Sequence, residues 1–165
     1  MVKKPEYRLQ VLLEMRERRK EEAEKALGAA IAAHKTELDK QKEMEDELAR
    51  MVARREQKKR EYAEKAMRGE MSAQEVVGAN VYLKRLVEQE DAQKAAIEAQ
   101  KAVVAQKDAE VGAARAAVVQ ATQELKALEK HKEKLAGEWK KAEQARDEET
   151  MDELAQQIFL RGDRS

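Results

Sequence analysis

The feature that most constrains the fold is a short interruption, Arg68-Gly69-Glu70-Met71-Ser72, between two long runs of helix-forming residues. The single proline, Pro5, lies near the start of the chain, so neither run is broken by proline. Gly69 can adopt the positive φ that ends a helix, and Ser72 with Glu75 matches the capping box that begins one. A helix end followed at once by a helix start predicts that the chain reverses between two helices.

The composition favours long paired helices over a compact globular domain. Charged residues make up 41% of the 165 residues and aromatic residues only 3%, which leaves little material for a bulky core. High charge with few aromatics is also typical of disordered chains. The helical periodicity and the abundance of Ala, Leu, Glu, Lys and Arg argue against disorder, because these residues favour helix.

Apolar residues form a seam along each run. In the second run they recur every seven residues, interrupted only by Glu90, with companion positions three residues later. These positions are Val76, Leu83, Ile97, Val104, Val111, Val118 and Leu125, with companions Ala79, Leu86, Gln93, Gln100, Lys107, Ala114, Ala121 and Leu128. The first run alternates steps of four and three through Leu27, Ile31, His34, Leu38, Gln41, Glu45, Leu48, Val52, Arg55, Lys59, Tyr62 and Ala66. Because several of these are polar, the first helix is expected to pair weakly.

We therefore predict an all-α fold, one antiparallel coiled-coil hairpin that forms a single domain over residues 1–165. The helices are expected at about 5–67 and about 72–160, with a turn at about 68–72 and a polar tail at 161–165. Pro5 suits the first turn of the first helix. Residue i should face residue about 140 − i, which places Gly28 opposite Gly112 and favours close approach of the helices there. The C-terminal helix is the longer one, so residues from about Trp139 onward lack a partner within the chain.

The charges make the two arms of the hairpin mildly complementary, and the pattern of the C-terminal end favours a protein partner. The formal net charge is zero, so binding of nucleic acid through bulk charge is not expected. Residues 1–68 hold 19 basic and 15 acidic residues, and residues 69–165 hold 15 basic and 19 acidic residues. The unpaired C-terminal stretch carries apolar residues among acidic ones, a combination that usually meets another protein.

No pattern of catalytic or metal-binding residues stands out. The sequence has no phosphate loop, no nucleophile with a partnered histidine and no cluster with metal-ligand spacing. His34 lies on the seam as a lone histidine, which is more typical of packing than of metal binding. A two-helix hairpin is also too thin to enclose a ligand pocket. We predict a non-enzyme without catalytic, metal or cofactor sites.

The absence of cysteine excludes disulfides and fits a reducing cytosol. Nothing resembles a signal peptide, and the longest mostly apolar run, residues 26–33, is far too short to span a membrane. A cytoplasmic protein that is not inserted in the membrane is expected.

Several segments, in order, resemble the FliJ/YscO family of type III export proteins. The opening Tyr7–Arg18 stretch has an aromatic-Leu-x-x-Leu-Leu cluster leading into an Arg/Glu-rich helix. Tyr82-Leu83 with Leu86 follows the hinge, then Leu128–Lys134, then a Glu-rich stretch ending in Met151–Ala155. Together these segments span most of the chain. His131 stands where the family often has an apolar residue.

The resemblance implies a cytoplasmic hairpin, peripheral to the export apparatus at the inner membrane, that acts as a central stalk. Its implied partners are the hexameric type III export ATPase, the export gate protein and export chaperones. The implied ATPase-interaction candidates are Tyr7, Leu9, Leu12, Leu13, Arg16, Arg18, Arg19, Asp152, Glu153 and Leu154. The candidates for gate or chaperone contacts are Tyr82, Leu83 and Leu86; Leu83 and Leu86 also lie on the seam, where packing competes with that role.

Two other functions fit the same pattern: a coiled-coil stalk subunit of a rotary ATPase, and a scaffold that holds partners apart. The sequence leaves open the flagellar or injectisome branch, the partner chaperones and the oligomeric state.

Overall fold

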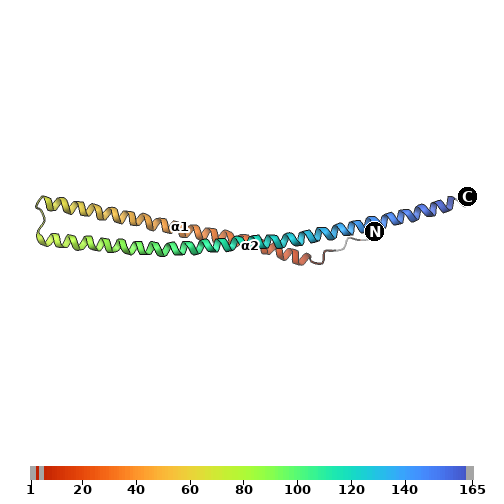
Figure 1. Cartoon of the computed structure of the whole chain (residues 1–165), viewed down its shortest axis with the longest axis horizontal. Helices are drawn as coiled ribbons and strands as arrows, with labels where there is room; N and C mark the ends of the chain where they lie inside the picture. The colour runs from red at the N-terminus through yellow and green to blue at the C-terminus, as the bar shows by residue number, and fades with distance from the viewer. Residues whose placement is uncertain (1–2, 4–5, 163–165) are drawn as a thin grey trace. The chain divides into compact units, whose positions relative to one another are not determined.

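The computed structural model describes residue 3 and residues 6–162, and most of these residues belong to two helices. Helix α1 spans Gln10–Met67 (58 residues) and helix α2 spans Ala73–Gly162 (90 residues). Both helices are labelled in Figure 1. The described residues contain no strand. The predicted all-α class, with two helices of which the second is longer, is confirmed.

The predicted start of the first helix, at about residue 5, is wrong for the described residues, because α1 begins only at Gln10. Residues 6–9 are not helical; Arg8 and Leu9 lie in a turn, which is closed by the Gln10 amide donating to the Tyr7 carbonyl at 3.0 Å. The Tyr7 hydroxyl also bonds His131 Nδ1 at 2.5 Å, which holds this segment on α2 in a non-helical path. Pro5 lies outside the described residues. At the other end α2 runs to Gly162, two residues past the predicted end, with Arg161 in the last turn, where a cation is favourable.

The hinge, residues 68–72 between the two helices, has the helix-ending glycine and the helix cap that its sequence predicts. Gly69 has a φ of 69°, its amide donates to the Ala66 carbonyl, and the Glu70 amide reaches back to the Lys65 carbonyl. These two bonds, around a glycine with positive φ, make the Schellman motif that ends a helix. The Ser72 hydroxyl then accepts the Glu75 amide at 3.1 Å, which is the first of the two capping-box bonds.

Contacts divide the chain into two units, which we call the hinge unit (residues 25–115) and the terminal unit (residues 1–24 and 116–165). In the hinge unit α1 and α2 run side by side in opposite directions from the turn (Figure 1), joined by bonds such as Gln93 to the Met44 carbonyl. The apolar core residues of α2 in this unit are Ala79, Leu86, Ile97 and Val111. The expectation of one domain over the whole chain stays a prediction.

The buried seam of α2 follows the predicted heptads closely. In α1 only one of the two predicted sets of seam residues faces α2 as expected. Val76 is the exception in α2, with 38% of its surface exposed. In α1 the residues from Leu27 to Tyr62 at seven-residue spacing face α2 as predicted. Their half-buried neighbours lie three residues later and not four, except for Val52, which is half-buried as predicted. Ile31 and Leu38 are therefore exposed, and the half-buried companions are Ala30, Glu37, Met44, Met51 and Lys58. Flexible methionines and the stems of charged side chains can fill such positions.

The predicted register holds, but the inference drawn from the glycines is wrong. The register places Gln100 opposite about residue 40, and its amide donates to the carbonyl and the carboxylate of Glu37, within one helical turn. Gly28 and Gly112 are both exposed, and a Cβ added to either would meet nothing within 4 Å. Close approach of the helices therefore does not depend on these two glycines.

In the terminal unit, the first turns of α1 pack against α2 through a small leucine core. Leu13, Leu125 and Leu128 are buried, and Leu12 packs against them. The last part of α2, drawn in blue in Figure 1, extends past the start of α1, and Tyr7 still contacts α2 there through His131.

We predict that Gly69→Ala destabilises the protein by about 1 kcal/mol, because alanine is strained at positive φ. The matched control is Gly78→Ala, since Gly78 lies inside α2 with open space around the added Cβ. That substitution should stabilise the protein by up to about 1 kcal/mol, because alanine favours helix over glycine. Urea unfolding followed by circular dichroism measures both; equal effects of the two substitutions would contradict the role given to Gly69.

Candidate functional site

The terminal unit ties the non-helical segment before α1 to the face of α2. Besides the hydrogen bond between Tyr7 and His131, the two rings lie 5.7 Å apart between centroids at an angle of 52°. Lys132 Nζ donates to Gln10 Oε1 at 2.9 Å. Two polar contacts and one aromatic contact therefore anchor residues 7–10 on one turn of α2.

An open groove of about 490 Å³ lies beside this anchor. It lies between the non-helical residues 6–9 and the face of α2. The lining is mostly apolar, with Arg8, Lys132 and Glu6 adding charge. Its lining residues are Glu6, Tyr7, Arg8, Leu9, His131, Lys132, Leu135, Ala136 and Trp139. The groove is open to solvent rather than enclosed, and it lies where the chain leaves the helical path.

Two of the arginines predicted to contact the ATPase make contacts with α2 of the same chain. The Arg16 guanidinium donates to the Glu124 backbone carbonyl at 3.0 Å. Arg19 lies 3.8 Å from the Glu124 carboxylate, although 67% of its side chain stays exposed. Arg18 is exposed. Charge reversal of all three would therefore disturb the pairing of α1 with α2 as well as any partner.

The predicted apolar candidates of this end also divide into two groups. Leu13 is only 4% exposed and belongs to the leucine core, against which Leu12 packs. Leu9 is 38% exposed and lines the groove, and Tyr7 is half-buried. Only Leu9 and Tyr7 of this set present apolar surface beside the groove.

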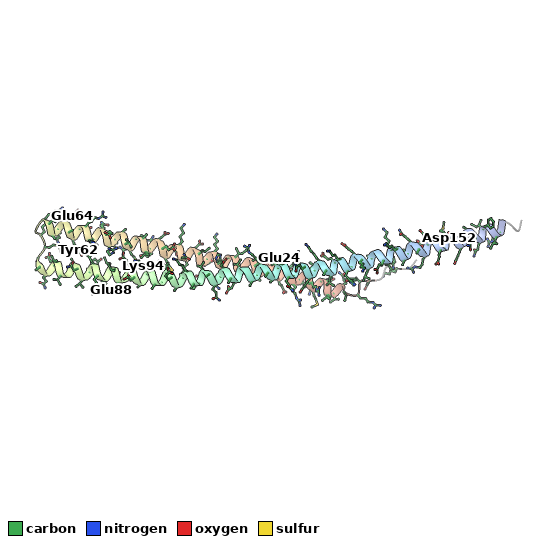
Figure 2. The ribbon with its side chains drawn as sticks, viewed as in Figure 1. Glu24, Tyr62, Glu64, Glu88, Lys94 and Asp152 are labelled. Carbon is green, nitrogen blue, oxygen red and sulfur yellow. The ribbon has the colours of Figure 1, made fainter. Side chains whose placement is uncertain are left out.

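The last part of α2 carries an uncovered apolar stripe. Every side chain from Gln144 to Leu160 is exposed, and Figure 2 labels Asp152 on this stretch. Met151, Leu154 and Ile158 share one helix face, with Asp152 and Glu153 beside them. At 3.6 residues per turn, this face is rotated by about 90° from the face that Leu125 and Leu128 present to α1. The stripe is therefore a separate surface and does not continue the intramolecular seam.

The candidates for gate or chaperone contacts lie in the hinge unit. Leu86 is buried, and Leu83 is half-buried on the seam. Tyr82 is half-buried and lies off the seam, so part of its side chain is accessible to a partner.

The anchor residues His131, Lys132 and Gln10 were not among the predicted site residues. The predicted register could have indicated these residues, because it places Tyr7 opposite about residue 133, within one helical turn of His131. In the described part of the chain no group of three or more His, Cys, Asp or Glu residues is placed to hold a metal ion. Over the same residues, neither helix has a stretch apolar enough to cross a membrane.

The geometry defines a class: an all-helical hairpin protein in which the last part of the longer helix is exposed on all sides. Residues 4–165 match the family model described as YscO-like protein. The chain belongs to the YscO-like family, which is linked to type III secretion. The predicted membership of the FliJ/YscO group is thereby confirmed.

A solved structure of a Chlamydia trachomatis protein, described as a proposed YscO homolog, has the same fold. It aligns with a TM-score of 0.83 over 98% of this chain and 99% of that chain, at 22% sequence identity. No curated protein matches the sequence.

Proposed function

We propose that this protein is a non-enzymatic central-stalk component of a bacterial type III protein export apparatus. In this proposal it associates with the hexameric export ATPase through the terminal unit, and with the export gate and chaperones through the hinge unit. It would act in the cytoplasm, peripheral to the apparatus at the inner membrane. Family membership supports the link to secretion, and the exposed surfaces of the chain support a binding role.

One observation carries the proposal: α2 exposes a complete apolar and acidic helix face from Gln144 to Leu160. Ile158 is 69% exposed and Phe159 is 70% exposed. Exposing contiguous large apolar side chains is unfavourable in water, and such a helix is typical of one that packs into a groove of a partner.

Within this proposal, exposure separates the candidate ATPase-contacting residues into two groups. Tyr7, Leu9, Arg18, Asp152, Glu153 and Leu154 have surface available to a partner, and we assign them to the contact. Leu12, Leu13, Arg16 and Arg19 contact α2, so we assign them to holding α1 in place. Their loss would weaken ATPase binding indirectly.

We predict that Asp152→Lys with Glu153→Lys weakens binding to the export ATPase at least about tenfold, because both carboxylates are exposed beside the apolar stripe. The matched control is Glu43→Lys with Asp46→Lys, which reverses two exposed acidic residues of α1 in the hinge unit. Both variants should keep the helical circular dichroism of the parent. Sedimentation with the purified ATPase measures binding; equal affinity of the two variants would contradict the assigned surface.

For the hinge unit, Tyr82→Ala should weaken binding to the gate protein or a chaperone while leaving thermal unfolding nearly unchanged. Leu86→Ala should lower stability by about 2 kcal/mol, because it removes buried apolar atoms from the seam. Calorimetry combined with a pull-down of the soluble gate domain separates the two effects. Loss of binding in Leu86→Ala alone, with Tyr82→Ala unaffected, would remove Tyr82 from the proposal.

A further inference from the structure

The seam of α2 is regular enough to pair with a copy of itself. Over residues 83–128 it presents apolar residues at strict heptad spacing, among them the buried Ile97, Val111 and Leu125. In a parallel pair of identical helices, each seam residue faces its own copy, so most layers of such a pair would be wholly apolar. The polar seam of α1 is a poorer partner by comparison, yet the structure pairs α2 with α1.

In the hinge unit, a charged residue, Glu90, occupies one position of the mostly apolar α2 seam. Glu90 is 3% exposed, and its carboxylate Oε2 accepts a hydrogen bond from Arg55 Nε of α1 at 2.6 Å. The Arg55 side chain is 22% exposed, and its guanidinium also reaches Glu56 at 3.2 Å. The hydrogen bond that Arg55 donates to Glu90 raises the pKa of the guanidinium above its ordinary value.

A contribution to the stability of the folded hairpin does not by itself explain the Arg55–Glu90 ion pair. The second carboxylate oxygen, Glu90 Oε1, is buried and has no hydrogen-bond partner among the described residues. Burying a carboxylate that is only partly satisfied is costly, and replacing a buried ion pair by apolar residues is often neutral or stabilising. A residue that costs stability at the centre of a regular seam needs another reason.

We infer that the Arg55–Glu90 pair selects α1 as the partner of the α2 seam and disfavours pairing of α2 with α2 of a second copy. In a parallel α2 pair, Glu90 would face Glu90, and two like charges would meet in an apolar seam without a cation. Pairing with α1 supplies Arg55 at this level. The hinge then determines that the α1 in question belongs to the same chain.

Two glutamines of the same seam favour the same partner. Gln93 donates to the Met44 carbonyl at 3.0 Å, and Gln100 donates to the Glu37 carboxylate at 2.6 Å. In a parallel α2 pair each glutamine would face its copy and lose these α1 acceptors. The three polar residues lie between Glu90 and Gln100, so they cover about one and a half heptads of the α2 seam.

One competing arrangement offers Glu90 a cation from α2 itself. Lys107 is half-buried on the seam, and an antiparallel α2 pair could set it opposite Glu90 of the second copy. In the hairpin Lys107 instead contacts Glu110 at 3.3 Å. The two arrangements predict opposite effects of removing Glu90, so one experiment separates them.

The test compares self-association of the full chain with that of Arg55→Leu/Glu90→Leu, by sedimentation equilibrium over a range of concentrations. The double variant should self-associate at least about tenfold more tightly than the parent, with an unfolding temperature no lower than the parent's. Arg55→Leu alone leaves a buried carboxylate without its cation and should lower the unfolding temperature by about 5 °C.

The matched control is Glu47→Leu/Arg50→Leu, which removes an ion pair of similar length, 2.7 Å, that lies exposed within α1. It should leave self-association within about twofold of the parent, as expected for a surface pair. Because the chain has no cysteine, Val104→Cys reports parallel pairing directly, since identical residues face each other only in that arrangement. Disulfide-linked dimers should accumulate in the double-variant background and not in the parent.

Three results would overturn the inference. One is a double variant that associates no more tightly than the control. Another is a parent that already associates as strongly as the double variant. The third is weaker association on Glu90→Leu, which would indicate that Glu90 pairs with Lys107 of a second copy.

Discussion

Burial of one face of α2 against α1 is the interaction on which the rest of this structure depends. Two paired helices share a single line of buried residues, so every position off that line faces solvent. In the hinge unit the line holds Ile97 and Val111, and in the terminal unit it ends in the cluster of Leu13, Leu125 and Leu128. A fold with so thin a core gives most of its residues to the surface, and binding to other proteins is the use that such a surface suits.

Much of the hinge unit could be predicted because its signals are local. The positive φ of Gly69 and the cap at Ser72 follow from residue types at fixed spacing, and the α2 heptads follow from periodicity. The companion column of α1 could not be read the same way. Glu37 lies inward because Gln100 bonds both its carbonyl and its carboxylate, which is a contact between distant residues. Leu38 is exposed as a consequence, although its type alone favours burial.

The candidate surfaces show the same division between local pattern and distant contact. The uncovered end of α2 followed from unequal helix lengths, which the sequence shows. The roles of Leu13 and Arg16 did not, because both residues are used by α2 within the chain. The turn before α1 depends on Tyr7 meeting His131, 124 positions later in the sequence. Candidate residues that look alike in the sequence therefore differ in the structure, because some of them already make contacts within the hairpin and others remain exposed.

The measurement that tests the central claim most directly is the turnover rate of the cognate export ATPase, titrated with the full chain at fixed enzyme concentration. The stalk account predicts stimulation that saturates near one chain for each hexameric ring, because a ring has one central axis. No effect on the rate or on ring assembly would contradict the account. It would leave the exposed helix face to a gate- or chaperone-binding role, or to a scaffold.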